Sequence, residues 1–294
     1  LLVTKRGALW AAGAHEGVAA TALLEEGRWH LRKHPELGPT VSSRALFESS
    51  DGALWFGTDD SSIRGDLDGG VLRYDGQTWS RFRPRVEAPD VVYGIGQSAD
   101  GSVWFGGSGT RRFDGESWTT VLEPRELLMG SWADVVYSDR KKNLWIGTRN
   151  YGVLKFDGTS WSRHDMQTGL AGNRTRAILQ TKDGSLWVAT DKGISRYDGK
   201  TWTTHALPVE LGSVSWDGLR ESSDGSLWIN RDGVNEAIRY RPDTNSPETT
   251  ISVSPGEVSQ RGTTTITWEG VDSWQQTANA DIQFSWRLDE DSWS

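Results

Sequence analysis

The sequence predicts an all-β fold, and three observations lead to this prediction. A short phrase ending in Trp occurs six times, with its Trp residues 41 to 49 positions apart: Trp10, Trp55, Trp104, Trp145, Trp187 and Trp228. A second phrase lies between these copies, as EGRW, YDGQTW, FDGESW, FDGTSW and YDGKTW. Asp-Gly pairs, which favour hairpin turns, separate the apolar runs. Repeats of this length and composition are typical of a β-propeller with one four-stranded blade per repeat.

The fifth repeat defines the expected blade. Its four strands, named A to D in chain order, are predicted at 176–181, 185–190, 194–197 and 201–205, with Asp-Gly turns after strands A and C. Blades two to five should each contain all four strands. Blade one lacks the start of strand A, and blade six stops after strand C at 237–240, because Pro242 breaks the pattern. We therefore expect six blades in a ring that these residues leave incomplete.

The connections between the strands differ on the two faces of the predicted propeller. In an up-and-down blade the A–B and C–D turns share one face, and here both are uniform. The B–C loops and the connections between blades share the opposite face, and they vary in length and sequence at 59–70, 83–90, 122–133, 165–175 and 206–215. We call this second surface the variable face and expect it to be a recognition surface.

The repeat period ends near Pro247. Three segments with alternating polar and apolar residues follow, beginning at residues 248, 263 and 281. Such alternation is typical of strands in a small β-sandwich, of which only the first part is present. The expected domains are therefore propeller repeats at 1–244 and the N-terminal part of a sandwich at 245–294.

The charge distribution and composition exclude several classes of protein. The chain has a net charge of −8, and the last 50 residues carry eight acidic and two basic side chains, so the propeller repeats are nearly neutral. Without a basic stripe, nucleic acid is not expected as a partner. No run of 18 apolar residues occurs, so no membrane contact is expected within these residues. The chain has no Cys and begins with Leu1 inside a strand-like run, and we interpret it as a piece of a longer protein.

Two segments resemble a known repeat family. The sequences NLWIGTRNYGVLKFDG (143–158) and DGSLWVATDKGISRYDG (183–199) are similar to the two-component regulator propeller repeat, and the resemblance extends over residues 1 to about 242. The tail, with Phe284, Trp286 and Trp293, resembles the start of the triple-tyrosine Ig-like domain. These resemblances imply the periplasmic or extracellular sensor region of a hybrid two-component system. They also imply an oligosaccharide ligand and a possible dimer through the Ig-like domain.

A candidate site emerges when strand A is aligned by counting back from the A–B turn. Seven residues before the turn, each of five blades has a polar or amphipathic residue, followed by a small one and then an apolar one. Trp132 and Trp216 lie beside two of these positions. Charged forks and a flat aromatic face are what a sugar or peptide site uses. The predicted ligand-binding residues are Arg44, Tyr93, Asp134, Arg176, Asp217, Trp132 and Trp216. The alternative is an inter-blade Arg–Asp network that closes the channel.

Catalytic and metal chemistry find weaker support in the sequence. His30, His164 and His205 occupy outer-strand repeat positions, where solvated or half-packed side chains are usual. The acidic residues of the B–C loop of blade two resemble an oxygen-rich Ca²⁺ site but fit no complete loop motif: Asp59, Asp60, Asp66 and Asp68. No cofactor or metal site is therefore predicted. We expect a non-enzymatic sensor region; the alternatives are a protein-interaction scaffold at the cell surface and a streptogramin-lyase-like enzyme acting through His and Mg²⁺.

Overall fold

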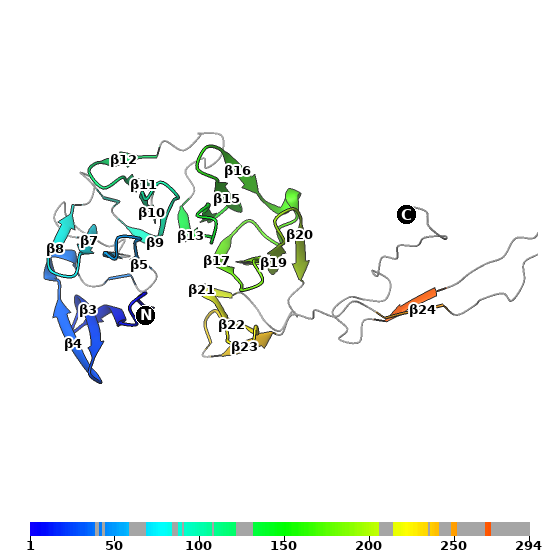
Figure 1. Cartoon of the computed structure of the whole chain (residues 1–294), viewed down its shortest axis with the longest axis horizontal. Helices are drawn as coiled ribbons and strands as arrows, with labels where there is room; N and C mark the ends of the chain where they lie inside the picture. Colours follow the sequence, from blue (N-terminus) through cyan, green and yellow to red (C-terminus); the bar gives the residue numbers. More distant parts are fainter. Residues whose placement is uncertain are drawn as a thin grey trace, which may run out of the picture. The chain divides into compact units, whose positions relative to one another are not determined.

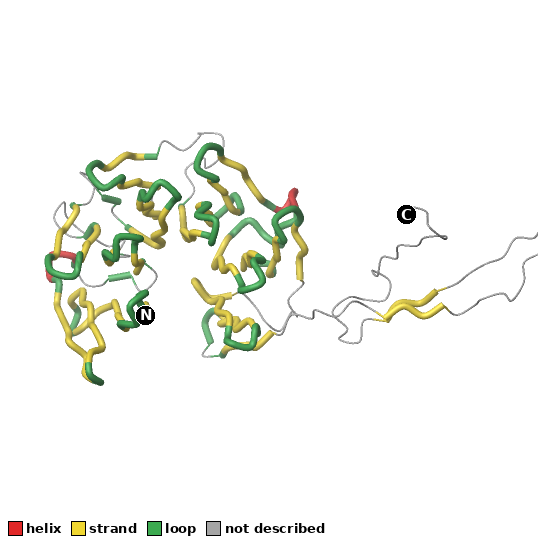
Figure 2. The backbone as a smooth tube through the Cα atoms, viewed as in Figure 1, coloured by secondary structure: helices red, strands yellow, loops and turns green. Residues whose placement is uncertain are grey.

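The computed structural model describes residues 1–38, 41–42, 45–58, 69–83, 88–89, 91–107, 109–121, 132–205, 214–234, 236–240, 248–251 and 268–271. The chain forms two compact units, Leu1–Tyr240 and Arg241–Ser294. In the first unit, strands alternate with short turns (Figure 2), and six antiparallel sheets follow one another (Figure 1). The expectation of an all-β propeller with six blades is confirmed.

The first three blades each contain four strands. Blade one consists of β1 (Leu2–Val3), β2 (Leu9–His15), β3 (Val18–Glu25) and β4 (Arg28–Lys33). Blade two consists of β5 (Leu46–Glu48), β6 (Leu54–Gly57), β7 (Val71–Tyr74) and β8 (Trp79–Phe82). Blade three consists of β9 (Val92–Gln97), β10 (Val103–Gly107), β11 (Thr110–Phe113) and β12 (Trp118–Thr120).

Blades four and five repeat this plan, whereas blade six has three strands among the described residues. Blade four consists of β13 (Ala133–Ser138), β14 (Leu144–Thr148), β15 (Val153–Phe156) and β16 (Trp161–His164). Blade five consists of β17 (Thr175–Gln180), β18 (Leu186–Thr190), β19 (Ile194–Tyr197) and β20 (Trp202–His205). Blade six consists of β21 (Val214–Glu221), β22 (Leu227–Arg231) and β23 (Ala237–Tyr240). The described part of the first unit also contains two 3₁₀ turns, Pro35–Leu37 and Met166–Thr168.

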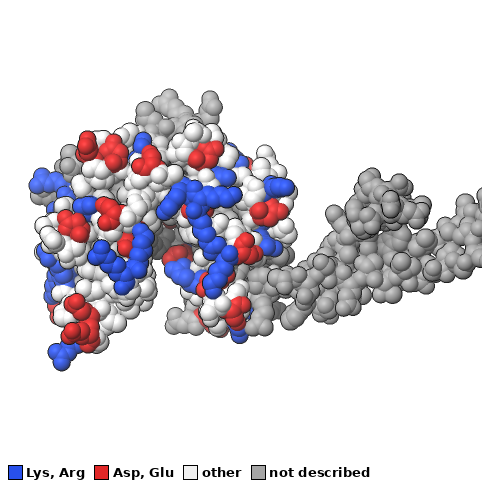
Figure 3. All heavy atoms as spheres, in the orientation of Figure 1, with Lys and Arg blue, Asp and Glu red and all other residues white. Residues whose placement is uncertain are grey.

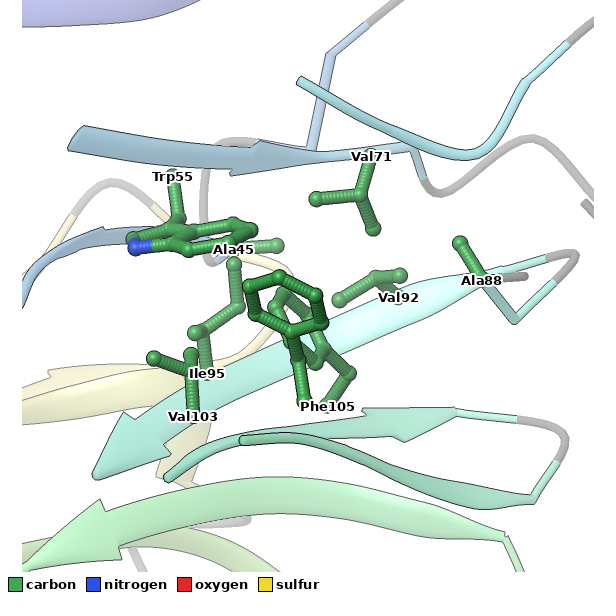
Figure 4. Packing of buried hydrophobic residues seen from close by; sticks show 9 residues of the cluster. Ala45, Trp55, Val71, Ala88, Val92, Ile95, Val103 and Phe105 are labelled. Carbon is green, nitrogen blue, oxygen red and sulfur yellow. The ribbon is translucent and has the colours of Figure 1, made fainter. Parts of the chain in front are cut away.

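The repeated Trp residues form the core between the sheets. In blades two to five they are buried, and each indole N–H donates a hydrogen bond to the residue that begins the A–B turn of its own blade. Trp55, for example, donates to Ser49 Oγ over 2.9 Å and lies against Phe105 of the next blade (Figure 4). The repeated phrase is therefore a packing motif: the indole fills the space between two blades and its one polar atom is satisfied.

Ion pairs between the A–B turn and strand C lie beside the Trp residues of this core. The Asp of the turn pairs with an Arg of strand C in four blades: Asp51–Arg73, Asp100–Arg112, Asp183–Arg196 and Asp224–Arg239. In three of these blades the guanidinium lies over the Trp ring, 5.6–5.9 Å from its centroid. Blade four has Lys141 at the turn and Lys155 in strand C, and Lys155 Nζ lies 5.2 Å from the Trp145 ring. These pairs are partly exposed, so each contributes little to the stability of the fold.

Close approach of the inner strands requires small residues. The A strands β5, β9, β13, β17 and β21 lie on the inner side of the blades (Figure 1). A Cβ atom at Gly94 would lie 2.5 Å from the backbone nitrogen of Val136 on the next blade. A Cβ atom at Gly147 would lie 2.4 Å from Thr175 Cγ2. Both distances are far below van der Waals contact, so the ring can converge at these positions only with glycine.

In blades two to five, the second Asp-Gly turn is held by its own carboxylate. Asp75 accepts hydrogen bonds from the side chain and backbone N–H of Thr78 and from the N–H of Gln77, which lower the pKa of Asp75 to about 2. Asp114 accepts equivalent bonds from the backbone N–H groups of Ser117 and Glu116 and from the Ser117 hydroxyl, and its pKa is also lowered to about 2. Bonds of this kind favour the charged form of the carboxyl group.

We expect acid to weaken the propeller between about pH 4 and pH 2. An unfolded Asp has a pKa of about 3.9. Because the folded pKa values of Asp75 and Asp114 are lower, their contribution to stability is complete above about pH 4 and disappears as the pH falls toward 2. Urea unfolding over this range measures the effect. The double variant Asp75→Asn/Asp114→Asn should be less stable near neutral pH and should lose less stability on acidification; an equally steep pH profile would contradict this origin.

Blade six differs from the others in the exposure of its core Trp. Trp228 is 40% exposed, whereas Trp187 in blade five is 2% exposed. Trp187 is covered by Leu219 and Leu227 of blade six. Within the first unit, the described residues form no sheet after blade six. Trp228 therefore occupies the same position in its repeat without an equivalent cover.

The second unit is described only at two strands. β24 (Glu248–Ile251) pairs antiparallel with β25 (Trp268–Val271). Phe284, Trp286 and Trp293, on which the Ig-like resemblance rests, lie outside the described residues, so the Ig-like domain remains a prediction. In the described part of the chain, the helical segments are too short to cross a membrane.

Candidate functional site

A bulge at the start of strand A positions the predicted site residues in three consecutive blades. In blade three, Val92 pairs with Gly107 and Gly94 with Gly106, so the register shifts at Tyr93. The same irregularity isolates Asp134 in blade four and Arg176 in blade five. A bulge leaves one residue unpaired and redirects its side chain. Tyr93, Asp134 and Arg176 are therefore structurally equivalent, at the variable face where strand A begins.

The first group of site residues, which we call the Trp132 cluster, consists of Tyr93, Trp132, Asp134 and Arg149. The Asp134 side chain is 1% exposed and accepts two hydrogen bonds from Arg149, Nη2–Oδ1 at 2.8 Å and Nε–Oδ2 at 3.1 Å. This bidentate pair raises the pKa of Arg149. The guanidinium lies 4.9 Å from the Trp132 ring, whose other neighbour is the Tyr93 ring at 5.8 Å. The opposite charges of Arg149 and Asp134 therefore neutralise each other within the cluster.

The second group, the Trp216 cluster, consists of Arg174, Arg176, Trp216 and Asp232. The guanidinium carbon of Arg176 lies 4.2 Å from the centroid of the Trp216 ring, and that of Arg174 lies 5.6 Å from it. Arg176 Nη1 is 3.6 Å from Asp232 Oδ2, which is an ion pair but is longer than a hydrogen bond. Burial, followed by the neighbouring charge of Arg174, lowers the pKa of Arg176.

Arg176 is buried without the hydrogen bonds that a buried guanidinium normally makes. Its side chain is 9% exposed, and its Nε atom has no hydrogen-bond partner in the structure; the same holds for Nε of Arg174. Most buried polar atoms in proteins have a partner, and exceptions call for a specific explanation. The Trp216 cluster therefore presents, beside an aromatic ring, guanidinium donors that the described residues do not use fully.

An insertion in blade six places Trp216 in this position. Val214 pairs with Arg231 and Leu219 with Ile229, whereas the equivalent residues of blade five, Thr175 and Ile178, are two positions closer together. The two additional residues widen the bulge, and Trp216 extends from it to Arg176. Asp217 adopts a left-handed backbone conformation (φ 52°) and forms an exposed ion pair with Arg220, Nη2–Oδ2 at 2.6 Å.

The structure thus brings together some of the predicted site residues and separates others. Tyr93, Trp132 and Asp134 form one cluster, Arg176 and Trp216 form the other, and the charge of Asp134 acts on Arg176 across the two blades. Asp217 pairs with Arg220 at the surface instead of joining either cluster. Arg44 lies outside the described residues, as do Asp59, Asp60, Asp66 and Asp68.

Three residues of these clusters were not found by aligning strand A. Arg149 and Asp232 lie in B–C loops, and Arg174 lies two residues before the aligned position of blade five. A periodic signal was nevertheless present: the residue directly after strand B is charged in blades four, five and six, as Arg149, Asp191 and Asp232. An alignment of this loop position together with strand A indicates Arg149 and Asp232, which are the partners of Asp134 and Arg176.

Two of the histidines, His34 and His164, make contacts typical of core packing. His34 is buried, with Nε2 at 2.9 Å from Thr21 Oγ1 and its ring against Trp79. His164 accepts a hydrogen bond from the indole N–H of Trp202 and stacks on Trp145. Within the described ranges, no group of three or more His, Asp or Glu side chains is placed to hold a metal ion.

A cavity lies on the face opposite to the two clusters. Its volume is about 610 Å³, and it lies between blades two and three, over Trp55, Phe82 and Phe113. Two of its carboxylates, Asp51 and Asp100, already pair with Arg73 and Arg112 as part of the repeated turn structure. Figure 3 shows acidic and basic side chains interspersed over the face in view. The cavity is therefore a groove between blades in which these two carboxylates already have partners.

Comparison with known proteins agrees with this architecture. The family described as two component regulator propeller matches residues 37–60 and 169–192. The chain contains two-component regulator propeller repeats. No curated protein matches the sequence.

Solved structures of similar fold include extracellular domains of putative two-component and one-component systems and a lyase. The extracellular domain of a putative hybrid two-component system from B. thetaiotaomicron is 19% identical with a TM-score of 0.53, over 90% of this chain and 42% of that one. The extracellular domain of a putative one-component system from the same organism is 18% identical with a TM-score of 0.58, over 81% and 32%. A catalytically inactive virginiamycin B lyase from Staphylococcus aureus, solved with quinupristin, is 17% identical with a TM-score of 0.58, over 85% and 86%. At these identities the likeness shows the fold alone.

Proposed function

We propose that this chain is the non-enzymatic ligand-recognition region of a bacterial sensor, placed in the periplasm or outside the cell. Its ligand is a polar molecule of the carbohydrate class, bound on the variable face at the Trp216 cluster. The two-component regulator propeller repeats and the fold shared with extracellular domains of putative two-component and one-component systems support this placement. The chain spans less than half of those two proteins, so any output domain is part of the proposal.

The observation that carries the proposal is the state of Arg176. A guanidinium that is nine-tenths buried, stacked on Trp216 and without a partner at Nε is a preorganised donor beside a flat aromatic surface. Carbohydrate and other polar ligands are held by this combination of directed hydrogen bonds and apolar contact. In the neighbouring Trp132 cluster, Arg149 and Asp134 are hydrogen-bonded to each other. This cluster forms a rigid wall of the same surface.

The proposal is tested by titrating a panel of oligosaccharides against the complete chain in a calorimeter. For an oligosaccharide that binds, Trp216→Ala should weaken the affinity by about 30-fold, the effect of losing an aromatic hot spot worth about 2 kcal/mol. The matched control is Trp29→Ala, because Trp29 is an exposed Trp of β4 outside both clusters, and it should leave binding unchanged. Equal effects of the two variants, or a fall in Tm of several degrees for Trp216→Ala, would contradict a ligand role at this site.

A further inference from the structure

The Trp216 cluster holds two positive charges beside one indole ring. Arg174 and Arg176 are two residues apart at the start of β17, and both guanidinium carbons lie within 5.6 Å of the Trp216 ring centroid. The charge of Arg174 accordingly acts unfavourably on Arg176. A like-charged pair of this kind is stabilised when a group of opposite charge binds to it.

The hydrogen-bond donors of this pair are largely unused. Each guanidinium has five N–H donors in a planar fork. Across the described residues, neither Arg174 nor Arg176 donates a side-chain hydrogen bond, and the Nε atoms of both are buried. Asp232 approaches Arg176 only to 3.6 Å, and its carboxylate is 43% exposed, so solvent competes for it.

Blade four provides an internal comparison for blade five. Arg149 N donates to Trp132 O over 3.1 Å, and Asp191 N donates to Arg174 O over 3.1 Å, so Arg149 and Asp191 are equivalent positions. The bulge residues Asp134 and Arg176 are also equivalent. Blade five thus has Arg176 at the bulge and Asp191 in the loop, where blade four has Asp134 and Arg149. The positive and negative residues have exchanged positions.

Despite this equivalence, Arg176 and Asp191 do not form the hydrogen-bonded ion pair that Arg149 and Asp134 form. Asp134 and Arg149 form a bidentate pair at 2.8 and 3.1 Å, whereas Asp191 acts on Arg176 only as a more distant charge. The carboxylate of Asp191 lies instead beside Gly172, where an added Cβ atom would be 2.7 Å from its Oδ1. The acidic groups that face Arg176 are therefore Asp134, already paired with Arg149, and the more distant Asp191 and Asp232.

We propose that the Arg174–Arg176 pair binds an anionic group of the ligand, either a carboxylate or a sulfate ester. This inference rests on the proposed function and specifies its ligand class as an acidic saccharide. Two planar forks side by side match the oxygen atoms of such groups, and arginine binds them in a bidentate manner that lysine does not reproduce. A neutral saccharide would add no counter-charge to this pair beyond the longer Arg176–Asp232 ion pair.

The experiment follows the arginine side chains directly. In the complete chain with ¹⁵N-labelled arginine, the Nε–H signals are assigned with the variants Arg174→Lys, Arg176→Lys and Arg149→Lys. Titrations use D-glucuronate, inorganic sulfate and, as the neutral counterpart, D-glucose. We expect saturable shifts of the Arg174 and Arg176 signals with one or both anions and none with glucose. The Arg149 signal should move little, because its donors are engaged by Asp134.

Affinity measurements separate this inference from the proposed function. Arg176→Ala should weaken anion binding by about 10- to 150-fold, as expected for loss of a charge-assisted contact. Arg176→Lys, which keeps the charge and loses the fork, should also weaken it. If a neutral oligosaccharide binds in a Trp216-dependent manner and no anion shifts Arg174 or Arg176, recognition stands and the anion assignment is overturned. Anion binding that is unchanged in Arg176→Ala would likewise overturn it. Saturable, Arg176-dependent binding of sulfate without any saccharide binding would keep the anion site and remove the carbohydrate.

Discussion

Replacing Trp187 by alanine is expected to lower the free energy of unfolding by about 3–5 kcal/mol. The indole of Trp187 is 2% exposed and packs against Ala177, Leu219 and Leu227. Its N–H donates to Thr181 Oγ1 over 3.2 Å. The substitution would leave a cavity between blades five and six and an unused acceptor at the turn. Urea or guanidinium unfolding of the complete chain measures the loss.

Trp228 provides the matched control for this prediction. It occupies the same position of the repeat one blade later, yet 40% of its surface is exposed. Trp228→Ala should therefore cost clearly less than Trp187→Ala, because a large part of the Trp228 ring already contacts solvent. A similar loss for the two variants would mean that the repeated Trp stabilises a blade from within its own sheet. A loss below about 1 kcal/mol for Trp187→Ala would show that it does not act as a core residue.

Arg149→Ala is expected to lower the free energy of unfolding by about 3 kcal/mol near neutral pH. The substitution removes both hydrogen bonds to Asp134 and leaves a carboxylate that is 1% exposed without a counter-charge. Breaking a buried ion pair from one side is costly, because the remaining charge has neither water nor a partner. Chemical unfolding measures the loss, and thermal unfolding provides an independent comparison.

A second substitution distinguishes the charge from the packing. Asp134→Asn/Arg149→Ala removes the buried charge as well, so it should recover a large part of the stability lost in the single variant. Equal stability of the single and double variants would show that Arg149 acts through its contact with Trp132, not through its charge. The Arg174→Ala variant should have a much smaller effect on stability, because its guanidinium forms no hydrogen bond within the described residues.

Strand positions could be predicted from local sequence because each blade repeats the same short-range interactions. The Trp of strand B, the hydroxyl or carboxyl group at the turn and the Asp-Gly pair all lie within about ten residues of each other, as in Thr181, Gly184 and Trp187. Even strand C of blade six was predicted at its observed bounds, Ala237–Tyr240. Interactions this local need no knowledge of the neighbouring blade.

The site was predicted only where the repeat keeps its length. Counting back from the turn located Tyr93, Asp134 and Arg176 at equivalent bulges, because blades three to five have the same number of residues in strand A. The count misplaces Asp217, because the pairing of β21 with β22 accommodates two additional residues. The charged partners Arg149 and Asp232 come from loops, and their choice of partner depends on which side chains the folded ring brings together.

The bulge at the start of strand A has a further consequence for how this architecture changes over time. Tyr93, Asp134 and Arg176 are chemically unlike, yet the ladders around them pair in the same way. A residue outside the ladder is released from the β-propensity and pairing constraints that act on its neighbours. Each repeat thus offers one position where substitution alters surface chemistry and leaves sheet geometry intact. Specificity in such a protein can evolve one blade at a time, by point mutation instead of loop exchange.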